Sequence, residues 1–456
     1  MNTYIIVGII LVALVALLAT NKKLVETLKN IYKIEELRQR ILFTLGLLLI
    51  YRLGSFVTLP GVDHSILEQW TQNFANDGSS LMGLLNIFSG GAFSQASIFA
   101  LGVMPYITAS IIIQLLGIMV PYFRKMQREG ESGRRKMNQW TRFLTIAVLL
   151  LQAPAYLATQ VISSGAVVAN GDFLGIANGQ FIVPAVIILI AGTMFIMWLG
   201  EKITDRGIGN GISLIIMIGI VARLPQSFLQ EFMFQTTGGG SIIMLLVELV
   251  FLALVFMLAI AIVQAVRKIP VQYAKRIVGN KQYGGVRQYI PLKLNAANVM
   301  PIIFAQALMF IPGLIWGGQW LDITSFWYNF TLVVLVIAFT YFYTAIIVNP
   351  QMMADDMKRN GGFIPGVKPG KSTVTYIDDI MTRITLPGSV FLAIITILPA
   401  IAMSLGITQG FAYFFGGTSL LIMVGVVLDT LKQIESYLLM RHYDGLMKTG
   451  RIQGRY

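Results

Sequence analysis

Two stretches of this chain read almost alike: GISLIIMIGIV at residues 211–221 and GTSLLIMVGVV at residues 417–427. Seven of the eleven positions are identical. A weaker match joins VMPYI at residues 103–107 with VMPII at residues 299–303. Apolar segments resemble one another by chance, so either match alone is modest evidence. Because both fall at corresponding places in two halves of the chain, they indicate an internal repeat.

The repeat lies in a chain with the composition of a membrane protein. Of 456 residues, 56% are hydrophobic and 12% are charged, whereas a soluble domain carries roughly 25% charge. A helix needs about 20 mostly apolar residues to cross a bilayer. The pattern predicts ten such helices and one extra segment at the N-terminus. Their predicted ranges are 4–19, 41–59, 96–120, 143–162, 181–199, 207–221, 241–265, 296–316, 330–348, 384–405 and 411–428.

Ten helices divide into two halves of five, and an odd number per half means that the second half enters the membrane inverted. We therefore expect an all-α integral membrane bundle of two inverted halves, with the functional path near the midplane between them. The predicted divisions are an extra N-terminal hydrophobic helix (1–20), a cytoplasmic amphipathic segment (21–40), an N-terminal half (41–230), a C-terminal half (231–428) and a cytoplasmic tail (429–456).

Lysine and arginine are distributed very unevenly between the alternate loops. One side of the predicted membrane holds 32 of the 34 basic residues. Arg223 lies near the other side, and Arg52 lies within a predicted helix. Since cytoplasmic loops carry the excess of basic residues, the C-terminal tail is expected in the cytoplasm.

The repeat pairs Ile107 with Ile303 and Ile216 with Ile422. The helical rise places all four at roughly 11–18 Å from a membrane face, close to the bilayer centre. Isoleucines in membrane helices ordinarily face lipid or the protein core. Four that share one depth and are related by the repeat favour a functional constriction. Pro105 and Pro301 precede the central isoleucines and predict helix kinks that could act as hinges, or else are ordinary membrane-helix prolines.

Several long stretches resemble the SecY family. They are NIFSGGAFSQASIFALGVMPYITASIIIQLL (86–116), EGESGRRK (129–136), WLGEKITDRGIGNGIS (198–213) and FGGTSLLI (415–422). The similarity extends from about residue 34 to the C-terminus. It implies a protein-conducting channel of the bacterial plasma membrane, which passes unfolded secretory polypeptides and releases transmembrane segments sideways into lipid.

The resemblance implies roles for particular residues. The family's pore ring, here called the collar, corresponds to Val103, Ile107, Ile212, Ile216, Ile303 and Ile422. Its plug, at about residues 81–93, includes Leu85, Asn86, Phe88, Ser89, Gly90 and Gly91. An aliphatic collar resists wetting and has no fixed hydrogen bonds to a passing chain. The glycine pair gives the freedom that a movable element needs, although a plain turn would use it too.

Polar and basic positions are implied as well. Thr108, Gln114 and Asn210 match the lateral gate, where a hydrogen-bond latch and static contacts between helices are alternatives. The loops at about 266–295 and 349–383 match docking sites for a motor or a ribosome. Their implied docking residues are Arg267, Lys268, Lys275, Arg276, Lys358, Arg359 and Lys368. The family usually has arginine at the last position, so the bidentate fork is lost there.

The resemblance implies SecE and SecG as membrane partners, and SecA or a ribosome with its nascent chain as the driving partner. Signal peptides, unfolded polypeptides and the lipid bilayer are the other expected contacts, and SecDF and YidC are further candidates. The chain has no GxxxxGK[ST] phosphate loop. Transport is therefore expected to be driven by a partner or by the proton-motive force. The chain has no cysteine, its two histidines, His64 and His442, lie far apart in the sequence, and no Ser/His/Asp set is recognisable. For these reasons we expect no enzyme activity, no catalytic residues, no metal and no cofactor.

Other interpretations stay open at this point. A secondary transporter for a small solute shares inverted repeats, but usually places polar ligands at the midplane. A membrane enzyme or a structural scaffold fits the sequence less well. Segment 1–20 could be an eleventh helix, a start-site artefact or a segment beside a partner; a cleaved signal peptide is disfavoured because no basic residue leads it. Arg52 and Glu248, at similar predicted depth, are a hypothetical ion pair.

Overall fold

The computed structural model describes residues 34–63, 65–67, 86, 88–167, 178–237, 241–273, 276–278, 281–283, 287–316 and 324–448. The predictions made for residues 1–20, for Leu85 and for Lys275 lie outside these ranges. The chain forms two compact units. The first comprises residues 1–53, 197–215 and 426–456, and the second comprises residues 54–196 and 216–425.

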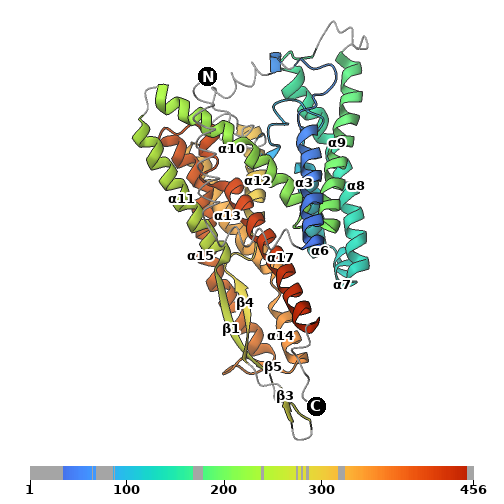
Figure 1. The fold of residues 1–456 in the computed structure, drawn as a ribbon, viewed down its shortest axis with the longest axis vertical. Coiled ribbons are helices and arrows are strands. Elements are labelled where there is room, and N and C mark those ends of the chain that lie inside the picture. The colour runs from blue at the N-terminus through green and yellow to red at the C-terminus, as the bar shows by residue number, and fades with distance from the viewer. Residues whose placement is uncertain are drawn as a thin grey trace. The chain divides into compact units, whose positions relative to one another are not determined.

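Helices account for most of the described chain (Figure 1). They are α3 (Glu35–Gly54), α6 (Met104–Met119), α7 (Pro121–Arg128), α8 (Glu131–Tyr156) with a π-helical continuation η1 (Leu157–Ile162), α9 (Asn178–Arg206), α10 (Gly211–Thr237), α11 (Ile242–Gln264), α12 (Met300–Trp316), α13 (Phe326–Ile347), α14 (Pro350–Arg359), α15 (Lys371–Ser404), α16 (Gln409–Ala412) and α17 (Gly417–Lys448). Within the described ranges, seven helices are long and apolar enough to cross a membrane. The prediction of an all-α membrane bundle is confirmed by this architecture.

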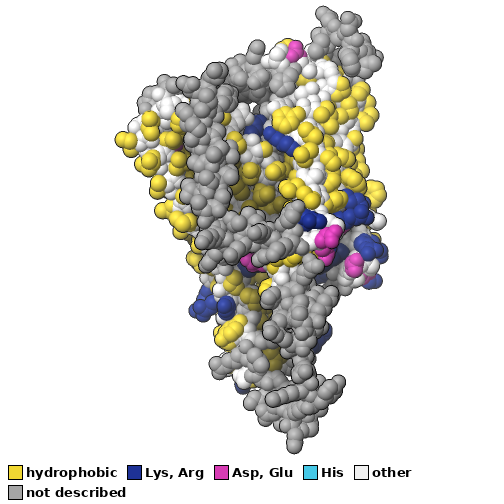
Figure 2. Space-filling view, in the orientation of Figure 1, with side chains coloured by type: hydrophobic (Ala, Val, Ile, Leu, Met, Phe, Trp, Pro, Cys, Tyr) yellow, Lys and Arg dark blue, Asp and Glu magenta, His cyan; other side chains and the backbone are white. Residues whose placement is uncertain are grey.

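Apolar and basic side chains occupy separate parts of the surface around α8 and α9, as expected for helices that cross a membrane. Figure 2 shows hydrophobic side chains over much of these helices and dark blue Lys and Arg side chains gathered near α7. α7 and the start of α8 contribute six basic residues between positions 124 and 136. The exposed face of α11 is apolar as well, with Ile243 76% exposed. Apolar surface of this kind is stable only in contact with lipid or with another protein.

The helix predicted at residues 207–221 is much longer in the structure. α10 begins at Gly211 and continues to Thr237. Its second half carries Ser227, Glu231 and Gln235, which are spaced four residues apart and are all buried. Residues at this spacing share one helix face. The helix therefore buries a polar stripe against its own protein, which lowers its hydropathy and led the sequence-based boundary to end too early.

The predicted kinks at Pro105 and Pro301 are wrong. Each proline is the second residue of its helix, because α6 begins at Met104 and α12 begins at Met300. A proline in the first turn removes no intrahelical hydrogen bond. The helix predicted from residue 96 starts late because residues 96–103 form turns, with positive φ at Ala96 (44°) and Gly102 (54°).

Four strands lie within residues 266–293, where the sequence predicted only a loop. β1 (Val266–Tyr273) pairs with β4 (Arg287–Lys293), and β5 (Gly362–Phe363) pairs with the other edge of β1, all antiparallel. In Figure 1, β1 and β4 lie as paired arrows beside α14. A shorter hairpin joins β2 (Arg276–Val278) and β3 (Lys281–Tyr283). The two long loops that were predicted separately thus share one sheet.

In the first unit, side chains bind the backbone of the turn between α9 and α10. The hydroxyl of Thr44 accepts a hydrogen bond from the amide of Ile208 at 3.1 Å. The amide of Gly209 donates to Oε1 of Gln433 at 2.7 Å. These bonds join α3, the turn and α17, and they satisfy backbone groups that a helix break would otherwise leave without partners.

Candidate functional site

The repeat-related isoleucines occupy equivalent places in the structure. Ile107 and Ile303 are each the fourth residue of their helices, α6 and α12. Ile216 and Ile422 are each the sixth residue of α10 and α17. The amide of Ile107 donates to the carbonyl of Val103, and the amide of Ile303 donates to the carbonyl of Val299. These matched helix starts support the internal repeat.

The collar side chains differ in their surroundings. Val103, Ile216 and Ile422 are buried, whereas Ile107 and Ile303 are partly exposed. Ile212 belongs to the first unit, where its side chain packs closely on the backbone of Gly200 in α9. A Cβ on Gly200 would lie 2.8 Å from Cγ1 of Ile212, so a larger residue would displace this side chain. The role of these residues as a collar stays a prediction.

The plug residues that the structure describes form a compact turn. The amide of Gly91 donates to the carbonyl of Asn86 at 2.9 Å, and the amide of Ser94 donates to Oδ1 of Asn86 at 3.2 Å. The hydroxyl of Ser89 accepts from the amide of Phe93 at 3.0 Å. Gly90 and Gly91 have φ values of 65° and 96°, which residues other than glycine rarely adopt. The glycine pair therefore shapes a defined turn.

This turn is seated on α10. The guanidinium of Arg223 donates from Nη2 to the hydroxyl of Ser94 at 3.1 Å. A Cβ added to Gly91 would lie 2.7 Å from the same nitrogen, so the arginine covers the glycine backbone. One turn earlier on α10, a Cβ on Gly219 would lie 3.0 Å from the carbonyl oxygen of Phe88. We call Gly219 and Arg223 the plug seat.

The plug seat continues the face of α10 that carries Ile216. Gly219 and Arg223 follow Ile216 by three and seven residues, and such spacings share one side of a helix. Sequence analysis missed both seat residues. A signal was available for Arg223, since it is the basic residue placed near the side of the membrane that otherwise lacks basic charge.

The three polar gate residues make local hydrogen bonds. Oδ1 of Asn210 accepts from the amides of Ile212 and Ser213 at 3.2 and 3.4 Å, so Asn210 caps the start of α10. The hydroxyl of Thr108 donates to the carbonyl of Met104. Nε2 of Gln114 donates to the hydroxyl of Ser110 at 3.4 Å. A latch between helices therefore stays a prediction for these residues.

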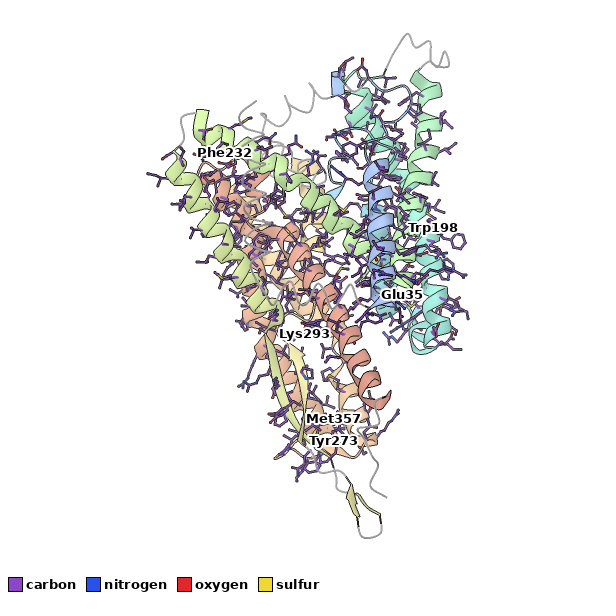
Figure 3. All side chains as sticks on the ribbon, in the orientation of Figure 1. Glu35, Trp198, Phe232, Tyr273, Lys293 and Met357 are labelled. Carbon is purple, nitrogen blue, oxygen red and sulfur yellow. The ribbon has the colours of Figure 1, made fainter. Side chains whose placement is uncertain are left out.

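The two long loops combine into one folded element, which we call the docking module and define as β1, β4, β5, α14 and the start of α15. Its core is formed by Ile269, Val271, Leu292, Met357, Ile364, Ile377 and Met381. Figure 3 shows Met357 of α14 beside Tyr273 at the end of β1. The core explains why segments about 80 residues apart in the sequence hold a fixed shape.

Basic side chains project from this module. Arg267 and Lys268 are exposed on β1, Lys358 and Arg359 end α14, and Lys368 is exposed in the turn before α15. Arg276 lies in β2. The turn at Lys368 is fixed by the Thr373 hydroxyl, which donates to the Lys368 carbonyl at 3.0 Å. Sequence predicted these residues as two sets, and the structure brings most of them onto one scaffold.

The sequence model of the SecY family matches residues 97–431 of the chain. The chain belongs to the SecY family. It is 41% identical over 445 residues to the protein translocase subunit SecY of Corynebacterium glutamicum, covering 91% of this chain and 98% of that protein. The matched range of the SecY family model includes α6 to α16 and the first part of α17, as far as Leu431.

Solved structures share the fold. One, described as the structure of a protein conducting channel, superposes with a TM-score of 0.58 at 18% identity and covers 87% of this chain and 91% of that one. A second has a TM-score of 0.54 at 18% identity, with 87% and 91% coverage. Its description states that the plug domain of SecY stabilises the closed state of the translocation channel and maintains a membrane seal. The fold of this chain is thus the SecY fold.

Truncating the core of the docking module should loosen it without affecting the membrane helices. Met357 is 6% exposed, and its replacement by alanine in a packed core costs about 2–5 kcal/mol. We expect Met357→Ala to speed amide hydrogen exchange in β1, β4 and α14 while leaving α8 unchanged. Met352→Ala is the matched control, because Met352 lies on the same helix and is 62% exposed. Equal exchange in the two variants would contradict a shared core.

Proposed function

We propose that the chain is the polypeptide-conducting subunit of a bacterial translocase in the plasma membrane, with its C-terminal tail in the cytoplasm. Membership in the SecY family gives the channel class, and the plug seat is the observation that carries the mechanism. A compact turn is held by Arg223 on the same helix face that carries Ile216. A barrier that is held by non-covalent contacts of this kind can leave when a polypeptide competes for its place.

The collar supplies the second barrier. Aliphatic side chains around a narrow passage disfavour water, and therefore ions, while they offer no hydrogen bond that would hold a passing chain. The plug closes the resting channel, and the collar closes around the polypeptide during transport. Apolar segments leave sideways between helices into lipid, and polar segments continue across.

The docking module is the surface for the driving partner. SecA, or a ribosome carrying a nascent chain, binds the exposed basic residues of β1 and α14. Basic groups suit ribosomal RNA because binding to phosphates releases counterions. SecE and SecG accompany the chain in the membrane, and SecDF and YidC are further candidates.

Reconstitution tests this function. The chain would be placed in lipid vesicles with SecE, SecG and SecA, together with a secretory precursor and ATP. We expect the precursor to become protected from added protease, and a precursor with an inactivated signal sequence to stay accessible. Protection of neither substrate, together with uptake of a small solute, would instead favour the transporter interpretation.

A further inference from the structure

Two carboxyl groups are buried together where α10 ends and α11 begins. Glu231 is fully buried, and Glu248 is 2% exposed. The side-chain amide of Gln235 donates to both, at 2.8 Å to Oε1 of Glu231 and at 3.1 Å to Oε1 of Glu248. Figure 3 labels Phe232, the residue next to Glu231, near this end of α10. A single amide nitrogen thus bridges two acids.

The two carboxyl groups accept different numbers of hydrogen bonds. Oε2 of Glu231 accepts from the amide of Thr408 at 2.8 Å and from the Thr408 hydroxyl. Oε2 of Glu248 is buried and has no hydrogen-bond partner among the described residues. A carboxylate oxygen buried in this way loses its hydration and gains nothing in return. Glu231 is therefore suited to carry a negative charge, and Glu248 is not.

The elements packed around the pair bring no compensating charge. α11 has no charged residue besides Glu248, and residues 404–416 have none. On α10, Arg223 lies eight residues before Glu231, about 12 Å along the axis, and its guanidinium donates to Ser94. Among the described residues of the neighbouring elements, the other titratable side chains are Tyr413 and, on α13, Tyr328, Tyr341 and Tyr343, which are neutral phenols at ordinary pH. The charged residues of α15 end at Arg383, 21 residues before Ser404.

The remaining surroundings are aromatic. The ring of Phe228 on α10 lies 6.0 Å from that of Phe411, and Phe411 lies 5.4 Å from Phe415. Phe251 of α11 stacks on Phe415 at 5.9 Å. These rings form an apolar cluster that joins α10 and α11 to the 404–416 segment. Two like charges in such a place oppose each other with little screening.

We propose that Glu231 and Glu248 form a binding site for a single proton, which resides on Oε2 of Glu248 and keeps the α10–α11 hairpin fastened to the 404–416 segment. The hydrogen-bond pattern favours one ionised and one neutral acid, because Glu231 accepts three hydrogen bonds and Glu248 accepts one. Removal of the proton puts a second negative charge between α10 and α11 and drives them apart. The site lies apart from the plug seat and the docking module, so this inference stands or falls independently of the proposed function.

Infrared spectroscopy of the full chain in lipid tests the site directly. At neutral pH we expect a carbonyl stretching band of a protonated carboxylic acid that shifts when H₂O is exchanged for D₂O. Glu248→Gln should abolish the band. Glu131→Gln is the matched control, because Glu131 is exposed and paired with Arg135 at 2.9 Å; it should leave the band intact. A spectrum without the band, or a band that survives in Glu248→Gln, would overturn the proposal.

Unfolding provides a second readout, with a sign that follows from proton linkage. The folded chain retains a proton that the unfolded chain releases, so stability falls as pH rises above the range in which a free glutamate titrates. Relative to Glu248→Gln, the unfolding equilibrium constant of the wild type should rise about tenfold per pH unit above that range, until the folded site loses its proton, because one proton is linked to unfolding. If Glu248→Gln does not fold, Glu231→Gln should weaken the infrared band at neutral pH, because the opposing charge is gone. Stabilisation by Na⁺ or Ca²⁺ at constant pH, with both acids ionised, would identify a metal cation as the ligand and contradict the proposal.

Discussion

Replacing Arg223 with alanine should make the resting channel leak small ions at least about tenfold faster than the wild type. The variant removes the hydrogen bond from the guanidinium to Ser94 and uncovers the backbone of Gly91. A hydrogen bond to a charged group contributes about 1.5–3 kcal/mol, and every 1.4 kcal/mol changes a population tenfold. The measurement is the release of a trapped fluorescent anion from vesicles that contain the chain with SecE and SecG and no precursor.

A second variant should also displace the plug from α10, by steric repulsion in place of a lost hydrogen bond. Gly219→Leu places a side chain where even a Cβ would lie 3.0 Å from the carbonyl oxygen of Phe88, and so lifts the plug sterically. Arg135→Ala is the control for loss of an arginine, because Arg135 is exposed and pairs with Glu131 on its own helix. A leak that is unchanged in both Arg223→Ala and Gly219→Leu would show that α10 does not hold the plug.

Fixing the plug to its seat should stop transport almost completely. The chain has no cysteine, so Ser94→Cys and Arg223→Cys introduce the only two thiols. A short cleavable bifunctional thiol reagent can join them because the wild-type side chains meet at this point. We expect protection of a secretory precursor to fall to the level without ATP after the reagent is added. Cleavage of the linker should then restore it.

Each single-cysteine variant treated with the same reagent is the control, because it carries the chemical modification without the bridge. We expect both to transport at the rate that they show without reagent. Full transport by the bridged double variant, with the bridge verified by mass, would mean that the polypeptide does not require the plug to leave α10.

Much of the fold could be predicted from the sequence because membrane helices can be recognised by their length and hydropathy. The repeat also located Ile107, Ile216, Ile303 and Ile422 at equivalent positions of their helices. The end of α10 could not be predicted in this way. Ser227, Glu231 and Gln235 face the protein interior, and hydropathy cannot distinguish a buried polar stripe from the start of a loop.

Other features depend on contacts between distant segments. The pairing of Gln272 with Phe363 joins two loops that have no periodicity in common, so the docking module could not be derived from either one. Pro105 predicted a kink only because the helix was placed too early, and the turns at residues 96–103 are fixed by backbone torsions that composition does not reveal. To predict the plug seat, one would have to know that a glycine and an arginine of α10 contact a turn more than 120 residues away in the sequence.

The central claim is that an unfolded polypeptide passes through the collar, and site-specific photocrosslinking tests it most directly. A photoreactive residue would replace Ile216 on α10, and separately Ile303 on α12, while a secretory chain is arrested in transit. We predict adducts to the arrested chain from both positions, and none when its signal sequence is inactivated. Absence of adducts at both positions, with the arrested chain captured at outward-facing sites such as the exposed Ile243, would contradict the account.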